Sequence, residues 1–111
     1  MTDHLAVIIP ADPAAPITFS RIPGTLAAAQ SVVGGDIEGV RAPDGVSAFC
    51  NADGKLTRLA PNTRATLYLA MAGGHNIDDV IVGDVLIIGD GVDGETVDVP
   101  ESVVEGIKYL L

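Results

Sequence analysis

The sequence predicts an α+β domain, in which a small, mainly antiparallel sheet has two or three helices packed on it. Short runs of apolar and β-branched residues, separated by turn sequences, predict the strands. Apolar residues at helical spacing, with a capping residue before them or a glycine after them, predict the helices. The chain has 111 residues, of which 48% are hydrophobic. That is enough for one core, so we expect residues 1–111 to form a single domain.

The first third of the chain predicts two strands and a helix. Residues 5–9 are an apolar run that ends at a proline, which is typical of a buried strand. Residues 10–16 contain three prolines and predict a rigid connection. Residues 17–22 alternate between apolar and polar types, which predicts a second strand suited to a sheet edge. Thr25 is a suitable N-cap for a helix over residues 26–33, and a glycine ends that helix.

The middle of the chain predicts a three-stranded meander over residues 36–59. Strand periodicity resumes at residues 37–41, and residues 46–51 form a second strand with alternating faces. Asp-Gly pairs at residues 44–45 and 53–54 are hairpin-type turns. The leucines that follow the second pair supply the third strand.

The last part of the chain predicts a helix, a long strand and a final helix. Asn62 suits the N-cap of a helix that runs through Met71, although the alternating apolar residues there fit a strand equally well. Residues 80–88 are the strongest strand signal, and Gly83 among them indicates a bulge or a close backbone approach. After a short strand at residues 96–99, a proline begins the final helix.

The charge of the chain is strongly acidic and unevenly distributed. The net charge of −9 disfavours binding to nucleic acid, because the phosphate backbone is also negative. Residues 65–107 contain nine acids and no Lys or Arg. This half either keeps the protein in solution or forms a surface for a basic partner, with Asp78, Asp79 and Asp84 as the candidate contacts. The more basic stretch before it also allows self-association of two copies.

No combination of residues predicts catalysis, a cofactor or a metal centre. Residues 89–94 match G-x-G-x-x-G, but an acidic, strand-like segment follows where a dinucleotide site needs a helix, so we interpret them as a turn. His75 lies near Asp78 and Asp79, yet an isolated loop histidine is the simpler interpretation. Cys50 is the single cysteine and is interpreted as a buried structural thiol. We therefore expect a protein that is not an enzyme.

One polar stretch, residues 50–64, is a candidate ligand-binding site. It brings two arginines, a lysine and two amide side chains close together around a tight turn, a combination that can bind an anion or a partner. The candidate residues are Asn51, Lys55, Arg58, Asn62 and Arg64. The alternative is turn chemistry around residues 51–54, a helix cap at Asn62 and solvated basic side chains.

Several short motifs occur in an order that resembles a known family. They are Val-Gly-Gly-Asp-Ile-Glu-Gly-Val at 33–40, Cys-Asn-Ala-Asp-Gly-Lys-Leu at 50–56, Pro-Asn-Thr-Arg at 61–64 and Asp-Val-Ile-Val-Gly at 79–83. Together they resemble the domain-of-unknown-function family 3846. The resemblance implies a small cytosolic protein that is encoded by a phage and acts inside a bacterial host. It supplies no catalytic residues to carry over.

Two functions follow as expectations. The first is a non-enzymatic accessory protein that binds a host macromolecule, a host protein above all, through its acidic second half. The alternative is a small-molecule-binding protein that sequesters a nucleotide-like ligand with the 51–64 stretch. Asp3 stands where an export signal needs positive charge, and the first apolar run is short, so we expect the cytosol and no membrane contact.

Overall fold

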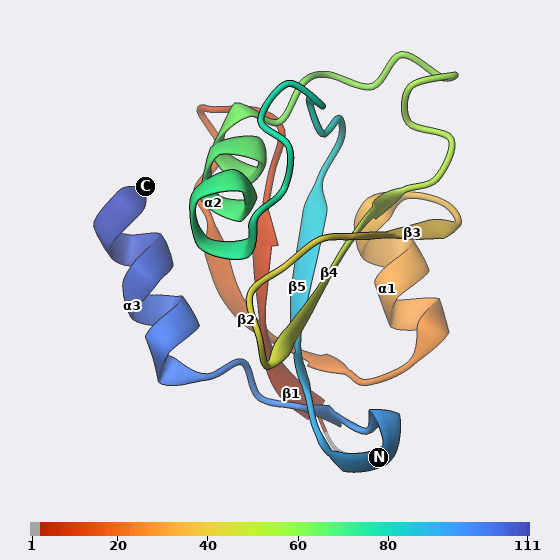
Figure 1. Ribbon diagram of the computed structural model, residues 1–111. Coiled ribbons are helices and arrows are strands. Elements are labelled where there is room, and N and C mark those ends of the chain that lie inside the picture. Colours follow the sequence, from red (N-terminus) through yellow and green to blue (C-terminus); the bar gives the residue numbers. More distant parts are fainter. Residues whose placement is uncertain (1–2) are drawn as a thin grey trace.

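The computed structural model describes residues 3–111 and contains one antiparallel sheet with three helices (Figure 1). In chain order the elements are β1 (Asp3–Ile9), β2 (Thr18–Pro23), α1 (Leu26–Val33), β3 (Ile37–Val40), β4 (Val46–Asn51), α2 (Thr63–Gly73), β5 (Val85–Asp90), the 3₁₀ turn η1 (Val92–Gly94), β6 (Thr96–Val97) and α3 (Glu101–Leu110). The strand order is β2-β1-β5-β4-β3, and β6 pairs with the end of β5. The predicted α+β fold class is confirmed.

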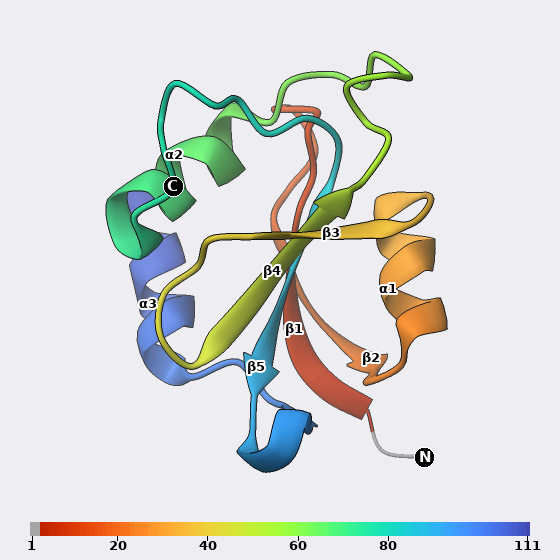
Figure 2. The same ribbon diagram turned by 45° about the vertical axis from the view of Figure 1, so that its right-hand side comes forward.

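The helices cover both faces of the sheet, α1 on one side and α2 with α3 on the other (Figures 1 and 2). The larger core lies under α2 and α3, where Tyr68 and Ile107 pack against alternate residues of the strands. The smaller core lies under α1, where Ala29 and Val33 meet Ala6 and Leu86. Because side chains alternate between the faces of a strand, each strand contributes to both cores.

The central strand β5 is buried on both faces. Val85, Leu86 and Ile87 have no exposed surface, which explains why this stretch is continuously apolar rather than alternating. Its two long neighbours are β1 and β4, so Ile87 is paired with Val7 on one side and with Ala48 on the other. The most continuously apolar strand of the sequence therefore lies at the middle of the sheet.

The predicted caps of the first two helices are confirmed. The Thr25 hydroxyl accepts a hydrogen bond from the Ala28 N–H at 3.2 Å, and Gly34 ends α1 with a φ of 81°. The Asn62 side chain accepts a hydrogen bond from the Ala65 N–H at 3.0 Å, which begins α2. Residues 63–73 are therefore a helix, and the strand interpretation of this segment was wrong.

The predicted third strand of the meander was also wrong. Of the three predicted strands, only the first two form, as β3 and β4, and residues 52–58 form successive turns instead. The Thr57 N–H donates to the Asp53 carbonyl at 2.9 Å, and the Leu59 N–H donates to the Gly54 carbonyl at 2.9 Å. Arg58 adopts a left-handed φ of 57°. These local bonds occupy the backbone groups that a strand would have used.

Two strands near the C-terminus are shorter than predicted. β5 begins at Val85 rather than at residue 80, because Gly83 has a left-handed φ of 78° that interrupts extended structure. Val82, before it, makes only an isolated bridge to Pro61. β6 is limited to two residues. Among residues 3–111, no helix combines the length and the apolar character needed to cross a bilayer.

Candidate functional site

A cavity of about 360 Å³ lies beside the edge strand β3, and we call it the β3 cavity. Three segments that are distant in the sequence form it: β3 with the end of β4, the turns after β4, and the connection from α2 to β5. Its lining residues are Glu38, Gly39, Val40, Arg41, Cys50, Asn51, Ala52, Lys55, His75, Asp79, Val80, Ile81 and Val82. The wall is therefore partly aliphatic and partly charged.

Glu38 and Cys50 meet in the lining of the cavity because β3 and β4 place them directly opposite each other. Opposed residues of antiparallel strands project from the same face. The Cys50 thiol donates to Glu38 Oε2 across 3.8 Å. Burial raises the pKa of Cys50 to about 11, and the neighbouring carboxylate adds to the rise. The thiol is therefore protonated at neutral pH, and the predicted buried cysteine is confirmed.

Lys55 and Asp79 join two of the segments across the cavity. Lys55 Nζ donates to Asp79 Oδ1 at 2.5 Å, and both side chains are exposed. This hydrogen bond and the lysine charge lower the pKa of Asp79, and the same interactions raise the pKa of Lys55. His75 Nε2 lies 2.6 Å from the Asp79 carbonyl oxygen. Since a carbonyl oxygen only accepts, Nε2 is the donor of this hydrogen bond.

Arg41 follows β3 at the other end of the cavity. Its guanidinium lies against the end of α2, where a Cβ on Gly74 would stand 3.5 Å from Arg41 Nε. Within residues 3–111, Arg41 makes no hydrogen bond or ion pair, and the Glu38 carboxylate has no partner except the Cys50 thiol. The cavity thus contains one cation and one anion with unused bonding capacity.

Asn62 lies elsewhere and is completely buried. Its Nδ2 donates to the carbonyl oxygens of Ile9 at 2.8 Å and Gly83 at 2.9 Å. Its Oδ1 accepts from the Ala65 N–H, as described above. These bonds connect β1, α2 and the approach to β5, so the amide has little capacity left for a ligand.

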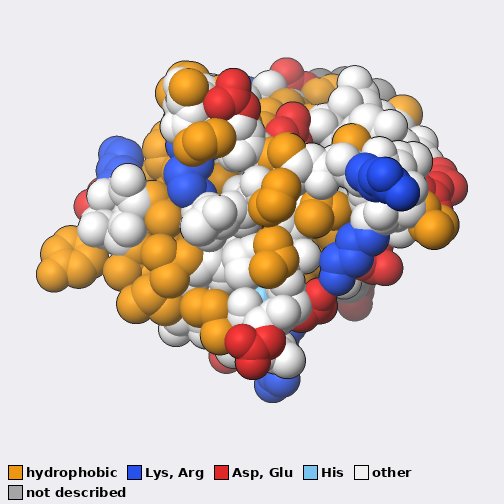
Figure 3. Space-filling view, turned by 90° about the horizontal axis from the view of Figure 1, so that it is seen from above, with side chains coloured by type: hydrophobic (Ala, Val, Ile, Leu, Met, Phe, Trp, Pro, Cys, Tyr) orange, Lys and Arg blue, Asp and Glu red, His pale blue; other side chains and the backbone are white. Residues whose placement is uncertain are grey.

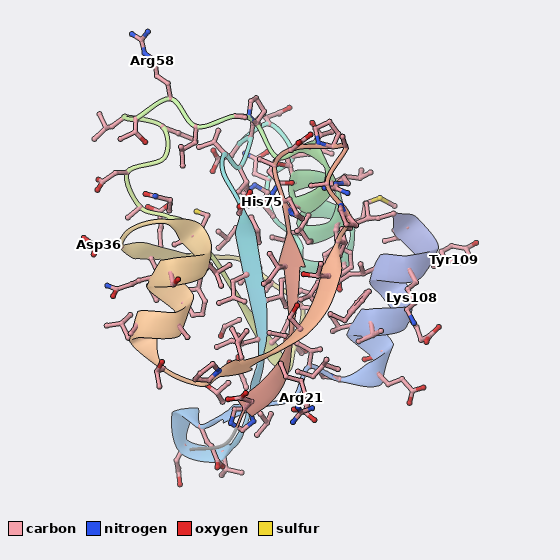
Figure 4. All side chains as sticks on the ribbon, turned by 180° about the vertical axis from the view of Figure 1, so that it is seen from behind. Arg21, Asp36, Arg58, His75, Lys108 and Tyr109 are labelled. Carbon is pink, nitrogen blue, oxygen red and sulfur yellow. The ribbon has the colours of Figure 1, made fainter. Side chains whose placement is uncertain are left out.

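The two candidate arginines also lie outside the β3 cavity. Arg64 Nη2 donates to the Pro10 carbonyl at 2.9 Å and to the Asp12 carbonyl at 3.0 Å, which attaches the proline-rich connection to α2. Arg58 is exposed at the tip of the turns and points away from the body of the protein (Figure 4). Of the five candidate ligand residues, the structure places only Asn51 and Lys55 in the cavity.

Asn51 lines the cavity while also shaping it. Its Nδ2 donates to the Val33 carbonyl at 3.2 Å, and its Oδ1 accepts from the Asp53 N–H at 2.8 Å. The side chain therefore fixes the start of the turns that carry Lys55.

The three candidate acids have different surroundings. Asp79 belongs to the cavity, as described above. Asp84 Oδ1 accepts from the Ala11 N–H at 2.9 Å, so this carboxylate fixes the beginning of the proline-rich connection. Asp78 is exposed. The lysine expected to bind a ligand and one aspartate expected to bind a partner thus form a single ion pair.

Sequence reasoning missed Glu38, Arg41 and the contribution of His75. A signal for Glu38 was present, because it shares a strand face with the apolar Val40, and a charged residue on an apolar face is unusual. His75 was noted beside Asp78 and Asp79 but interpreted as an isolated loop histidine, and no comparable signal indicated Arg41. In the described part of the chain, no group of three or more His, Cys, Asp or Glu side chains is arranged to hold a metal ion.

The surface at this end of the molecule differs from one side to the other. Seen from above, hydrophobic side chains gather over α2 and α3, and acidic and basic side chains lie next to one another on the side of the 52–60 turns (Figure 3). Leu67 and Met71 are exposed on α2, and Tyr109 is 90% exposed on α3. The charged side is the side on which the turns bring Lys55 to the cavity.

Comparison with known proteins identifies a family but no function. The sequence model of the family described as Domain of unknown function (DUF3846) matches residues 4–110, which is nearly the whole chain. No curated protein and no solved structure matches the chain at a significant level.

Proposed function

We propose that this protein, which belongs to the DUF3846 family, is a small-molecule-binding protein that holds a polar, nucleotide-like ligand in the β3 cavity. One observation carries the proposal. Glu38 and Arg41 line the same cavity with opposite charges, and neither is in an ion pair within the described residues. Charged groups that do not stabilise the fold and that converge on a hollow are typical of binding sites.

The size and charge of the cavity support a small polar ligand. Its volume of about 360 Å³ lies in the range of small-molecule sites. Two acids, Glu38 and Asp79, face two bases, Arg41 and Lys55, so the charges of the site are balanced. Balanced charges favour a ligand that carries both hydrogen-bond donors and an anionic group over a simple anion.

The chemistry of the cavity supports binding without turnover. Cys50 lines the cavity, and its raised pKa keeps it in the unreactive thiol form. The family resemblance supports a phage-encoded protein in the cytosol of a bacterial host. In that setting, sequestration of a nucleotide-like signal would need no chemical step.

Native mass spectrometry of the full chain, purified gently from a bacterial lysate, tests the proposal. We expect a mass adduct in the range of a small metabolite. The adduct should persist in Arg58→Gln and disappear in Arg41→Gln, because only Arg41 lines the cavity. A protein without any adduct, together with no binding to a nucleotide panel, would refute the assignment.

A second candidate is the binding of a basic host protein to the acidic end of the sheet. The Asp90 N–H donates to the Gly45 carbonyl at 2.9 Å, so Asp44 and Asp90 lie at the same end of the molecule. Arg21 Nη2 lies 3.9 Å from Asp98 Oδ1, and both side chains are exposed. Neutralising Asp44, Asp90 and Asp93 should then weaken capture of the host protein more than neutralising Asp78, Asp79 and Asp84. Equal capture by both variants would exclude this end as the contact.

A further inference from the structure

The Glu38 carboxylate is suited to a particular type of ligand group. Oε2 accepts a weak hydrogen bond from the Cys50 thiol. No Lys or Arg in residues 3–111 lies within ion-pair distance of either carboxylate oxygen. Lys55, the nearby cation of the cavity, is already bound to Asp79. A carboxylate in this state accepts two parallel N–H bonds from a planar group with adjacent donors. Such groups are the Watson–Crick edge of guanine and the guanidinium of arginine.

The position of Arg41 adds a requirement on the length of the ligand. Arg41 stands three residues after Glu38 and one residue past the end of β3, so the two backbone positions are at most about 10 Å apart. The charged groups of a simple amino acid share one carbon atom and cannot reach both side chains. A guanine nucleotide can, because its donor edge and its 5′-phosphate lie at opposite ends of the molecule. The guanidinium and the carboxylate of free arginine are also separated by the length of a side chain.

Part of the cavity lining is aliphatic. Val40, Val80, Ile81 and Val82 line the cavity, and Ile81 is buried. Branched aliphatic side chains offer apolar contact to a flat ring or to a methylene chain. The lining contains no Phe, Tyr or Trp within the part of the chain that the structure describes, so contact with a ring would be aliphatic rather than stacked.

We propose that the β3 cavity recognises a ligand with two adjacent N–H donors at one end, bound by Glu38, and an anionic group at the other end, bound by Arg41. This inference rests on the proposed function and specifies its ligand class. Guanine nucleotides and arginine share the required chemistry. Adenine does not, because it presents an acceptor nitrogen where guanine presents the second donor.

Isothermal titration calorimetry of the full chain with GMP, AMP, guanosine and L-arginine tests the inference. We expect GMP or L-arginine to bind, and the one that binds identifies the source of the donor pair. AMP should bind at least about tenfold more weakly than GMP, because it leaves the carboxylate facing an acceptor. Guanosine should also bind more weakly than GMP, because it lacks the anion for Arg41.

Variants of Glu38 and Arg41 test which end of the ligand each side chain binds. Glu38→Gln should lower the affinity for the ligand about tenfold or more, since an amide offers only one acceptor to the donor pair. Glu105→Gln, on the exposed surface of α3, should leave binding unchanged. Arg41→Gln should lower the affinity for GMP about tenfold and leave the affinity for guanosine unchanged. Thermal unfolding of each variant should match the parent, because all three altered side chains are exposed.

The outcomes separate this inference from the proposed function. If GMP and AMP bind equally, or if Glu38→Gln retains full affinity, the ligand class is wrong and the binding function stands. If neither GMP nor L-arginine binds while native mass spectrometry shows another adduct, the ligand class is again wrong. If no adduct is found and none of the four compounds binds, both the ligand class and the proposed function are refuted.

Discussion

The β3 cavity and the start of α2 contain similar polar residues but use them differently. At the start of α2, Asn62, Arg64 and Thr66 direct their side chains at backbone groups of the fold, and we call these three residues the Asn62 node. At the cavity, Glu38 and Arg41 have almost no partners within the described chain. The comparison teaches that residue type does not separate a structural polar group from a binding group. What separates them is whether the side chain still has unused hydrogen-bonding capacity in the folded state.

The largest expected effect is that of Asn62→Ala. The substitution removes the cap of α2 and leaves the Ile9 and Gly83 carbonyl oxygens without their donor. Loss of the cap and of two buried bonds should lower the free energy of unfolding by about 3–5 kcal/mol. Urea denaturation measures the change. Asn76→Ala, at an exposed asparagine in the connection after α2, is the matched control and should change little. Similar losses for the two variants would contradict the structural role of the Asn62 node.

The second prediction concerns the thiol of Cys50. Its pKa of about 11 in the folded protein, against 9.0 ordinarily, reduces the thiolate fraction at pH 8 about a hundredfold. A thiol reagent should therefore react much more slowly with the native protein than with the protein in urea. Since the folded pKa is raised, the associated stability is complete below pH 9 and is lost as the pH rises toward 11. Cys50→Ser should remove that alkaline loss, and equal labelling rates in both states would show that the thiol is accessible.

The third prediction contrasts two arginines. Arg64→Met removes two hydrogen bonds to backbone carbonyls and should lower the free energy of unfolding by about 1–2 kcal/mol. It should not change ligand affinity, because Arg64 lies outside the cavity. Arg58→Met should change neither quantity. The comparison of the two regions fails if Arg64→Met abolishes binding at unchanged stability.

The smallest effect is expected from the ion pair between Lys55 and Asp79, which is exposed to solvent. Lys55 lowers the pKa of Asp79 below its ordinary value of 3.8. A lowered pKa gives stability that is present above about pH 4 and lost as the pH falls below it. Lys55→Met should therefore flatten the acid side of the stability curve, and high salt should do the same in the parent. Parallel curves for parent and variant between pH 2 and 6 would show that the pair contributes nothing.

Much of the fold could be predicted because its signals are local. Thr25 and Asn62 identify helix starts by their own chemistry, and the apolar run in β5 reports burial on both faces. The failed third strand shows the limit of such reasoning. The carbonyls of Asp53 and Gly54 accept hydrogen bonds from backbone N–H groups four and five residues later, which forms successive turns. The alternation of apolar and polar residues does not reveal that these backbone groups are already bonded.

The candidate site was much less predictable, because it depends on pairing between distant segments. Lys55 meets Asp79 across 24 positions of sequence, and Glu38 meets Cys50 only through the register of two strands. The polar stretch at residues 50–64 was therefore divided by the fold. Its first part faces the cavity, and its last part is used to hold α2 in place.

The position of β5 also has a consequence for the order in which the molecule can assemble. β1 with β2, and β3 with β4, are pairs of strands close in the chain, and each can form early. Neither pair contacts the other until β5 inserts between them and pairs Ile87 with both Val7 and Ala48. Such long-range pairing slows folding, because a long loop must close before the contacts form. Until β5 is in place, the edges of β1 and β4 that it covers stay open, and open strand edges allow pairing with other chains.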